Sequence, residues 1–473
     1  MGLMSKSRMV LKKVIKSKFG IKLQKRITMK TKTNMKQITY LFLLLIGFSA
    51  TAQDKKWTLQ ECVTHALENN ISVLQGQNTL LSNEQDIIAS KGQFLPTVSG
   101  SAGHSLSLGN TEIFPGQFVD RTSNSTSFSV SANQTVFNGF RLTNLYKQSQ
   151  LSLETNRLEL NRIKDDISLN VVNAYLNVLF NIENLEIAEA QYGFTEKQLK
   201  QVQDLVDAGV QPQANIYDAQ ATLSRDLQSV TVAQNNYDIS LLTLSQLLQV
   251  PYKGFDVQVI EVNDPSAELM YDDATPIVAY ALANRYEVKV AEKNIENAEL
   301  STDISKSGFL PFISVGYGFG SNVFYTNLIQ TENTFFNQLN DQKAHSFRLN
   351  ISIPIFSQFQ NKTNVAKAKI QEENAKLSLV QTKLSLEANV QRAFTDAKAA
   401  FRSYEAAKVS LEAQNIAFQN AQERYNIGAM NAFDIEQTRL RLVNAEASLV
   451  NAKYDFIFKT KVLDFYLGKP ITE

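Results

Sequence analysis

The sequence predicts a mostly helical protein with a smaller β portion, built from two copies of one unit. Three observations lead to this prediction. Helix-breaking residues are scarce, the same order of sequence patterns occurs twice, and short segments alternate between apolar and polar residues. The 473 residues include only 9 prolines and 19 glycines. Because a proline inside a helix costs about 3 kcal/mol, this scarcity favours very long helices.

The two copies are related by an offset of 215 residues that later becomes 219. The shorter offset places Pro96 on Pro311, at the end of a Phe-Leu-Pro motif that both copies share. The longer offset places Gly209 on Gly428. Such self-similarity indicates a duplicated structural unit. We therefore expect three parts, given by residue number: repeat 1 over 53–250, a linker over 251–275 and repeat 2 over 276–473.

Each repeat contains a long stretch without proline. There is none between Arg141 and Gln211, and none between Ile355 and Lys469. As a helix, the first stretch would span about 100 Å at 1.5 Å per residue, which is several times the diameter of a compact domain. Such a helix cannot be buried in an ordinary globular core.

A heptad pattern marks the long stretch of repeat 2. Its apolar residues recur at the spacing of a coiled-coil seam; they are Ala397, Tyr404, Leu411, Phe418 and Tyr425. Periodicity alone fits one face of a helical bundle equally well. Because glycine readily takes the left-handed conformation that ends a helix, we expect turns at Gly209 and Gly428. The two antiparallel helical hairpins would then cover about 141–250 and 358–468.

Four short segments have the alternation of β-strands. In the clearest one Ile313, Val315, Tyr317 and Phe319 share one face, and serine or glycine occupies the other. Their lengths, near ten residues, match a membrane-spanning strand. We expect strands at about 96–108, 125–137, 311–321 and 345–356. The polar stretches 109–124 and 321–344 would be outer loops.

The predicted strands are too few to close a barrel within one chain, since about eight is the smallest number that does. Three chains would supply twelve strands and a matching ring of twelve long helices. We therefore expect a homotrimer with a 12-stranded membrane β-barrel and a 12-helix α-barrel. A periplasmic β-sandwich has the same alternation, so the strands by themselves leave that alternative open.

The N-terminal segment has the pattern of a secretory signal. From Met35 a basic start precedes an apolar run that is too short to span a membrane as a helix, followed by Ala50-Thr51-Ala52. We expect cleavage after Ala52 and a true start at Met35, so that 1–52 is a basic leader and signal peptide. Cys62, about ten residues past this site, is too far along to be a lipidated first residue, and we expect it to be buried.

Composition and motifs argue against catalysis and against nucleic-acid binding. The 47 basic and 46 acidic residues give a formal net charge of +1, which provides no field for capturing nucleic acid. The sequence has no pair of cysteines, no HExxH, no glycine-rich phosphate loop and no GxSxG motif. The three histidines are isolated. We expect no enzyme activity, no cofactor and no metal site.

Paired motifs in this order resemble the TolC family of outer-membrane efflux proteins. They are the segments Ala66-Leu67-Glu68-Asn69 and Ala281-Leu282-Ala283-Asn284, the two Leu-Pro strand entries and the two glycine turns. The likeness covers about Trp57 to Leu467. It implies a trimer whose barrel lies in outer-membrane lipid and whose helical tunnel crosses the periplasm to a periplasmic adaptor and an inner-membrane transporter.

The resemblance implies passive export of small molecules such as drugs and toxic compounds. Two alternatives remain: the same fold serving protein secretion, and a non-channel coiled-coil structural protein of the envelope. The family's position for an acidic side chain that narrows the periplasmic end is occupied by Asp434. The next such position is Gln437, a departure from the pattern, and Asp218, with Asn215 one turn before it, lies at the comparable place in repeat 1.

The same resemblance assigns the hairpin turns to contact with the adaptor. The residues concerned are Gly209, Gly428, Met430 and Tyr425. Three copies of Asp434 would form an anionic ring that attracts cations.

Overall fold

The computed structural model describes residues 56–259, 271–329 and 332–470. The predicted signal peptide and its cleavage residues Ala50 and Ala52 lie outside this range. In repeat 1, the elements that precede the long helices are β1 (Lys56–Trp57), α3 (Leu59–Asn69), α4 (Ile71–Gly92), β2 (Thr97–Phe114) and β3 (Gln117–Asn138). In repeat 2, they are α7 (Thr275–Asn284), α8 (Tyr286–Lys306), the 3-10 helix η1 (Ser307–Phe309), β5 (Phe312–Thr326), α9 (Phe335–Asp341) and β6 (Ala344–Ser352). β4 (Asp256–Val257) pairs in parallel with β1.

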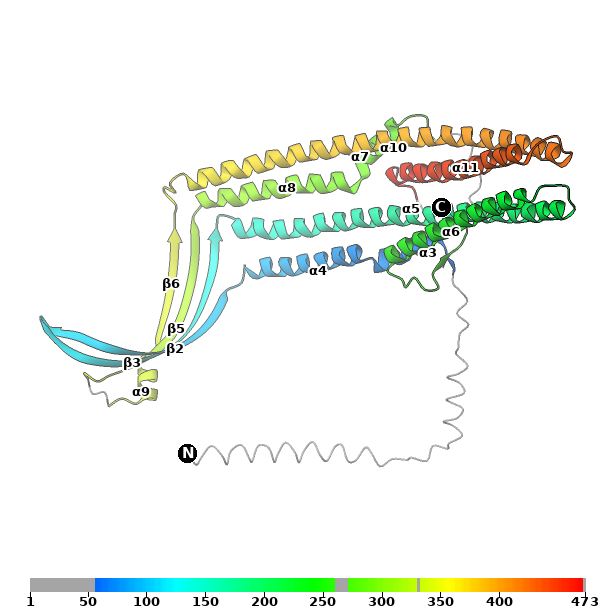
Figure 1. Ribbon diagram of the computed structural model, residues 1–473. Helices are drawn as coiled ribbons and strands as arrows, with labels where there is room; N and C mark the ends of the chain where they lie inside the picture. The colour runs from blue at the N-terminus through cyan, green and yellow to red at the C-terminus, as the bar shows by residue number, and fades with distance from the viewer. Residues whose placement is uncertain (1–55, 260–270, 330–331, 471–473) are drawn as a thin grey trace, which may run out of the picture. The chain divides into compact units, whose positions relative to one another are not determined.

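The proline-free stretches form four long helices of matched length. α5 (Arg141–Asp207) and α10 (Gln360–Asn426) have 67 residues each. α6 (Ala214–Leu248) and α11 (Ala432–Tyr466) have 35 each. Figure 1 shows α5 with α6 and α10 with α11 as two hairpins.

Both hairpin turns have the same backbone. Gly209 has a φ of 74° and Gly428 a φ of 73°, so both take the left-handed conformation that favours glycine. After each glycine the next N–H reaches back to the preceding helix: Val210 donates to the Leu205 carbonyl at 2.9 Å, and Ala429 donates to the Arg424 carbonyl at 2.7 Å. This is the Schellman arrangement that satisfies carbonyls at a helix end.

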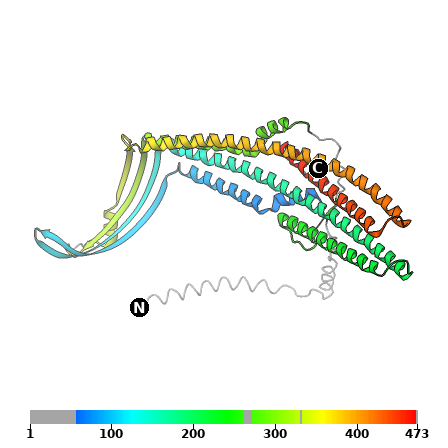
Figure 2. The same ribbon diagram turned by 45° about the horizontal axis from the view of Figure 1, so that its top comes forward.

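Shorter helices extend the hairpins toward the sheet. α4 packs on α5 and α8 packs on both α5 and α10, on the stretches that α6 and α11 leave uncovered (Figures 1 and 2). The two largest buried clusters lie near the junctions with the short helices. Cys62 is fully buried in the first of these clusters, as expected. In the heptad seam Ala397 and Tyr404 are buried, whereas the three later positions are half-buried.

The four strands form one antiparallel sheet in the order β2-β3-β5-β6. Its register sets apolar side chains of neighbouring strands beside one another: Val130 lies opposite Phe319, and Tyr317 opposite Phe347. Serine fills much of the other face, where Ser99 and Ser131 share a hydrogen bond of 2.9 Å. The sheet therefore has one apolar face and one polar face, called here by those names.

The predicted loop at 109–124 is wrong. β2 and β3 pair without a loop up to Phe114 and Gln117, and only Pro115 and Gly116 turn between them. Gly116 has a φ of 83°. Polar side chains do not prevent a ladder that backbone groups hold together, and the Pro-Gly pair was the overlooked turn signal.

The predicted loop at 321–344 is wrong in part. β5 continues to Thr326, and α9 forms after Thr334, whose hydroxyl accepts the Asn337 N–H at 3.4 Å. β6 ends at Ser352, earlier than the expected 356, because Pro354 has no N–H to donate to a ladder. In the part of the chain described here, no helix is apolar over a length that would cross a bilayer.

Candidate functional site

The two hairpin ends, residues 202–222 and 421–439, are called the tip. They contain every residue that the sequence suggested for a constriction or for contact with an adaptor. Both ends lie at the extremity of the helices opposite the sheet (Figure 1). The side chains of α5, α6 and α11 meet around one cavity here.

Asp434 lies in the first turn of α11 and is exposed. The Asn431 side chain caps the helix by accepting the Asp434 N–H at 2.8 Å. Within the described residues, the Asp434 carboxylate has no hydrogen bond or ion pair. Its negative charge at a helix N-terminus is favourable, because the helix dipole is positive there.

The offset of 219 aligns the acidic positions of the two hairpins in an alternating way. Asn215 corresponds to Asp434, and Asp218 corresponds to Gln437. Each hairpin thus carries one acid, but one helical turn apart. The Asn215 amide donates to Gln211 Oε1 at 3.2 Å, so this position is a local hydrogen-bond donor in repeat 1.

A cavity of about 330 Å³ lies between the α5–α6 hairpin and α11. Asn215 and Asp218 line it together with Phe433 and Glu436 of α11. The structure therefore brings Asn215 and Asp218 together, while Asp434 is not part of the lining. Gln437 is half-buried.

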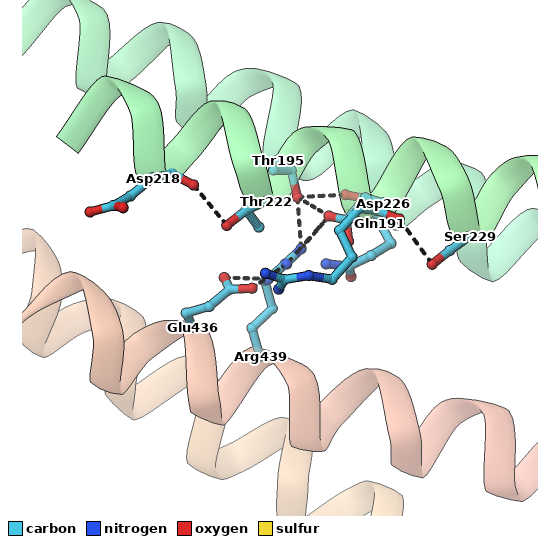
Figure 3. A network of polar contacts seen from close by, with 9 residues as sticks. Gln191, Thr195, Asp218, Thr222, Asp226, Ser229, Glu436 and Arg439 are labelled. Carbon is cyan, nitrogen blue, oxygen red and sulfur yellow. Dashed lines mark hydrogen bonds and ion pairs between the residues drawn. The ribbon is translucent and has the colours of Figure 1, made fainter. Parts of the chain in front are cut away.

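A buried arginine joins the two hairpins beside this cavity. Arg439 of α11 is 2% exposed and donates to the Thr195 hydroxyl of α5 at 2.8 Å. Its guanidinium lies 3.4 Å from the Asp226 carboxylate of α6 and 2.6 Å from Glu436 on its own helix. Figure 3 shows these side chains converging from three helices. Asp226 is also buried and accepts a hydrogen bond from Thr195.

Two further side chains, those of Gln191 and Phe194, surround the buried Arg439 guanidinium. Gln191 lies beside the same guanidinium (Figure 3), and the Phe194 ring lies 5.6 Å from it. Sequence reasoning missed this cluster. The available signal was the Glu436–Arg439 spacing of three residues, which places both side chains on one helix face. Nothing in the sequence pairs that face with Asp226.

Large apolar side chains are exposed at the turns. Val210 is 69% exposed, Ile427 is 79% exposed and Phe433 is 69% exposed. Met430 and Tyr425 are half-buried. The apolar surface at the turns is therefore formed mainly by residues next to the glycines, and less by the two residues chosen from the sequence.

The duplicated hairpins match a known family over most of the chain. The sequence profile of the family described as "Outer membrane efflux protein" matches residues 62–249 and 277–469. This chain belongs to that family. Its members are outer-membrane channel proteins and not enzymes, and the TolC-like fold expected from the sequence is confirmed.

Individual relatives are distant in sequence, and the matches cover two thirds or more of their length. The outer membrane protein TolC of Vibrio cholerae is 22% identical, over 87% of this chain and 90% of that protein. The pyoverdine export outer membrane protein OpmQ of Pseudomonas putida is 22% identical, over 69% of this chain and 67% of that protein. The solved CmeC channel of Campylobacter jejuni has a TM-score of 0.73 at 18% identity, over 87% of this chain and 85% of that chain.

Proposed function

We propose that three copies of this chain assemble into an outer-membrane channel that passively exports small molecules. The observation that carries the proposal is the pair of open sheet edges. Within the described residues, β2 and β6 pair on one side only, so each presents unsatisfied backbone groups along its outer side. Such an edge is stable when another chain pairs with it.

Closure by a ring of copies resolves both edges at once. If β6 of one chain pairs with β2 of the next, the contact is head-to-tail and repeats until the ring closes. Three copies give twelve strands, enough for a barrel, whereas two copies give only the minimum. The apolar face would then meet lipid, and the polar face, with Ser99 and Ser131, would meet water. The long helices would continue this barrel as a periplasmic tunnel.

The cargo and partners follow from the tip and from the relatives. A family relative is named for export of pyoverdine, a small molecule, which favours small cargo for this chain too. Exposed apolar residues at the turns, Val210 and Ile427 among them, favour docking of the tip on a periplasmic adaptor that links it to an inner-membrane transporter.

The acid at the tip provides selectivity without chemistry. Asp434 is exposed and has no partner in the described residues of its own chain. Three such carboxylates around a narrow opening would attract cations and repel anions. Gly209 and Gly428 would shape the turns that surround this opening.

The test is conductance of the purified protein in planar bilayers, with its assembly state measured by native mass spectrometry. Trimers that conduct with a preference for cations are expected. Asp434→Ala should lower that preference, whereas Asp86→Ala, an equal charge change on exposed α4, should leave it unchanged. A trimeric preparation without conductance would end the channel proposal.

A further inference from the structure

The short helix α9 is held against the apolar face of the sheet. The Phe335 ring meets the Phe128 ring edge-on, with centroids 6.5 Å apart. Gln338 is 3% exposed, and its side-chain oxygen accepts the Phe324 N–H at 2.9 Å. The Ser321 hydroxyl donates to the Leu339 carbonyl at 2.6 Å. A polar side chain buried in this way fixes the helix in one position.

A cavity of about 620 Å³ lies between α9 and the sheet. Its floor is apolar because β3 and β5 contribute Phe128, Val130 and Phe319. β2 contributes only small residues, since Ala102 lies opposite Phe128 and Gly100 lies opposite Val130. The hollow is therefore a consequence of pairing large residues on one strand with small residues on the next. Its size is in the range of sites that enclose small ligands.

The cavity has a basic margin. Lys343, which connects α9 to β6, is the one charged residue among those lining it, and Asn340 lies beside it in the lining. No ion pair of Lys343 occurs among the described residues. An apolar hollow with an amine at its margin complements an amphiphile that has an acyl chain and an anionic head group.

We propose that this cavity binds an acyl chain of lipid A, with a lipid A phosphate at Lys343. The inference rests on the proposed function, because it needs the apolar face in the outer membrane and the tip in the periplasm. α9 lies where β5 ends and β6 begins, at the ends of these two strands that point away from the helices (Figure 1), which would place it in the outer leaflet. Phosphorylated, multiply acylated glycolipid is the main lipid of that leaflet. A neighbouring copy would pair at the edges and leave this floor uncovered.

The experiment measures lipid A binding to the delipidated full-length protein in detergent by native mass spectrometry. Ala102→Trp fills the hollow and should abolish binding. Ala132→Trp makes the same change on the apolar face outside the cavity lining and should not. Lys343→Gln should weaken binding about fivefold, the effect of one lysine near an anionic lipid surface, while Lys362→Gln on exposed α10 should not.

Two outcomes would overturn the inference. One is binding by Ala102→Trp equal to that of the unchanged protein. The other is equal binding of phosphatidylglycerol, which would mean a site for any anionic lipid. Conductance measured on the same preparations separates this inference from the channel proposal. A conducting protein that binds no lipid A contradicts the lipid site alone, and a non-conducting protein contradicts the channel.

Discussion

The long helices of repeat 1 and repeat 2 have matched lengths, but the two repeats bury different polar groups. At the corner between the short helices of each repeat, the offset of 215 aligns Asn70 with Arg285. Asn70 caps α4 by accepting the Ser72 N–H at 2.9 Å, and it donates to the Leu247 carbonyl of its own repeat at 3.1 Å. The neutral residue therefore stays within repeat 1.

Arg285 acts across the repeats instead. Its guanidinium lies 3.1 Å from the Asp165 carboxylate of α5 and 4.0 Å from the centre of the Phe465 ring. Burial raises the pKa of the Asp165 carboxyl, and the arginine pulls against that rise. Arg285 is 5% exposed, so little solvent screens the pair from its side.

At the tip, as at the corner, an arginine of repeat 2 contacts an acid of repeat 1. Arg439 of repeat 2 reaches Asp226 of repeat 1, while its counterpart at an offset of 219, Gln220, is exposed. The two acids of repeat 1 have apolar counterparts in repeat 2, where Ala445 corresponds to Asp226 and Leu384 corresponds to Asp165. At both places an arginine of repeat 2 contacts an acid of repeat 1, in addition to an acid on its own helix. The two repeats therefore share a pattern of long helices, but their buried polar residues differ and pair one repeat with the other.

The largest effect is expected from removing the Arg439–Asp226 ion pair at the tip. Arg439→Met would leave Asp226 buried without its cation, which typically costs about 3–5 kcal/mol. The expected result is a lower free energy of unfolding, with faster hydrogen exchange in the tip ends of α6 and α11. Arg441→Met, an exposed arginine on the same helix, is the control. Adding Asp226→Ala, the residue found in repeat 2, should recover part of the loss, because Glu436 still lacks its cation. No recovery would contradict a paired-charge role.

A substitution at the corner tests the Arg285–Asp165 ion pair. Arg285→Asn places the residue found in repeat 1 at this position of repeat 2 and removes the cation beside Asp165. We expect a loss of about 1–3 kcal/mol, smaller than at the tip because Asp165 is partly solvated. Denaturant unfolding measures it, with Lys289→Asn on the same helix as control. Equal midpoints for the two variants would mean that the corner pair adds no stability.

The sequence could predict the backbone of these helices but not the polar contacts between them. Scarce prolines and the aligned glycines were enough to place α5, α10 and both turns, because these are local signals. The Arg439–Thr195 contact joins residues 244 positions apart, and no local pattern records such a pairing. α9 was missed for the same reason, since its position depends on the sheet beneath it. The β2–β3 extension was predictable in principle from Pro115 and Gly116.

The acids of the two hairpins should differ in their effect on ion selectivity. Among the described residues the Asp434 carboxylate has no hydrogen bond or ion pair, and it is not part of the cavity lining, whereas Asp218 and Glu436 both line the cavity. We therefore expect Asp434→Asn to bring the cation-to-anion permeability ratio closer to one, and Asp218→Asn to change it less. Reversal potentials in a salt gradient measure both. A larger effect of Asp218→Asn would assign the constriction to repeat 1.

The smallest effect is expected at Glu446, where repeat 1 has Leu227 at the offset of 219. Burial raises the pKa of the Glu446 carboxyl above its ordinary value of 4.5. The folded state therefore holds this proton more tightly than the unfolded state, and its contribution to stability is lost as pH rises through the raised pKa. Glu446→Gln removes the buried charge and should stabilise the protein at pH 7 by less than about 1 kcal/mol, since solvent screens a half-buried group. The gain should disappear below about pH 4, where both forms are neutral. Melting temperatures at the two pH values test this, and an equal gain at both would mean that the substitution acts through packing and not through charge.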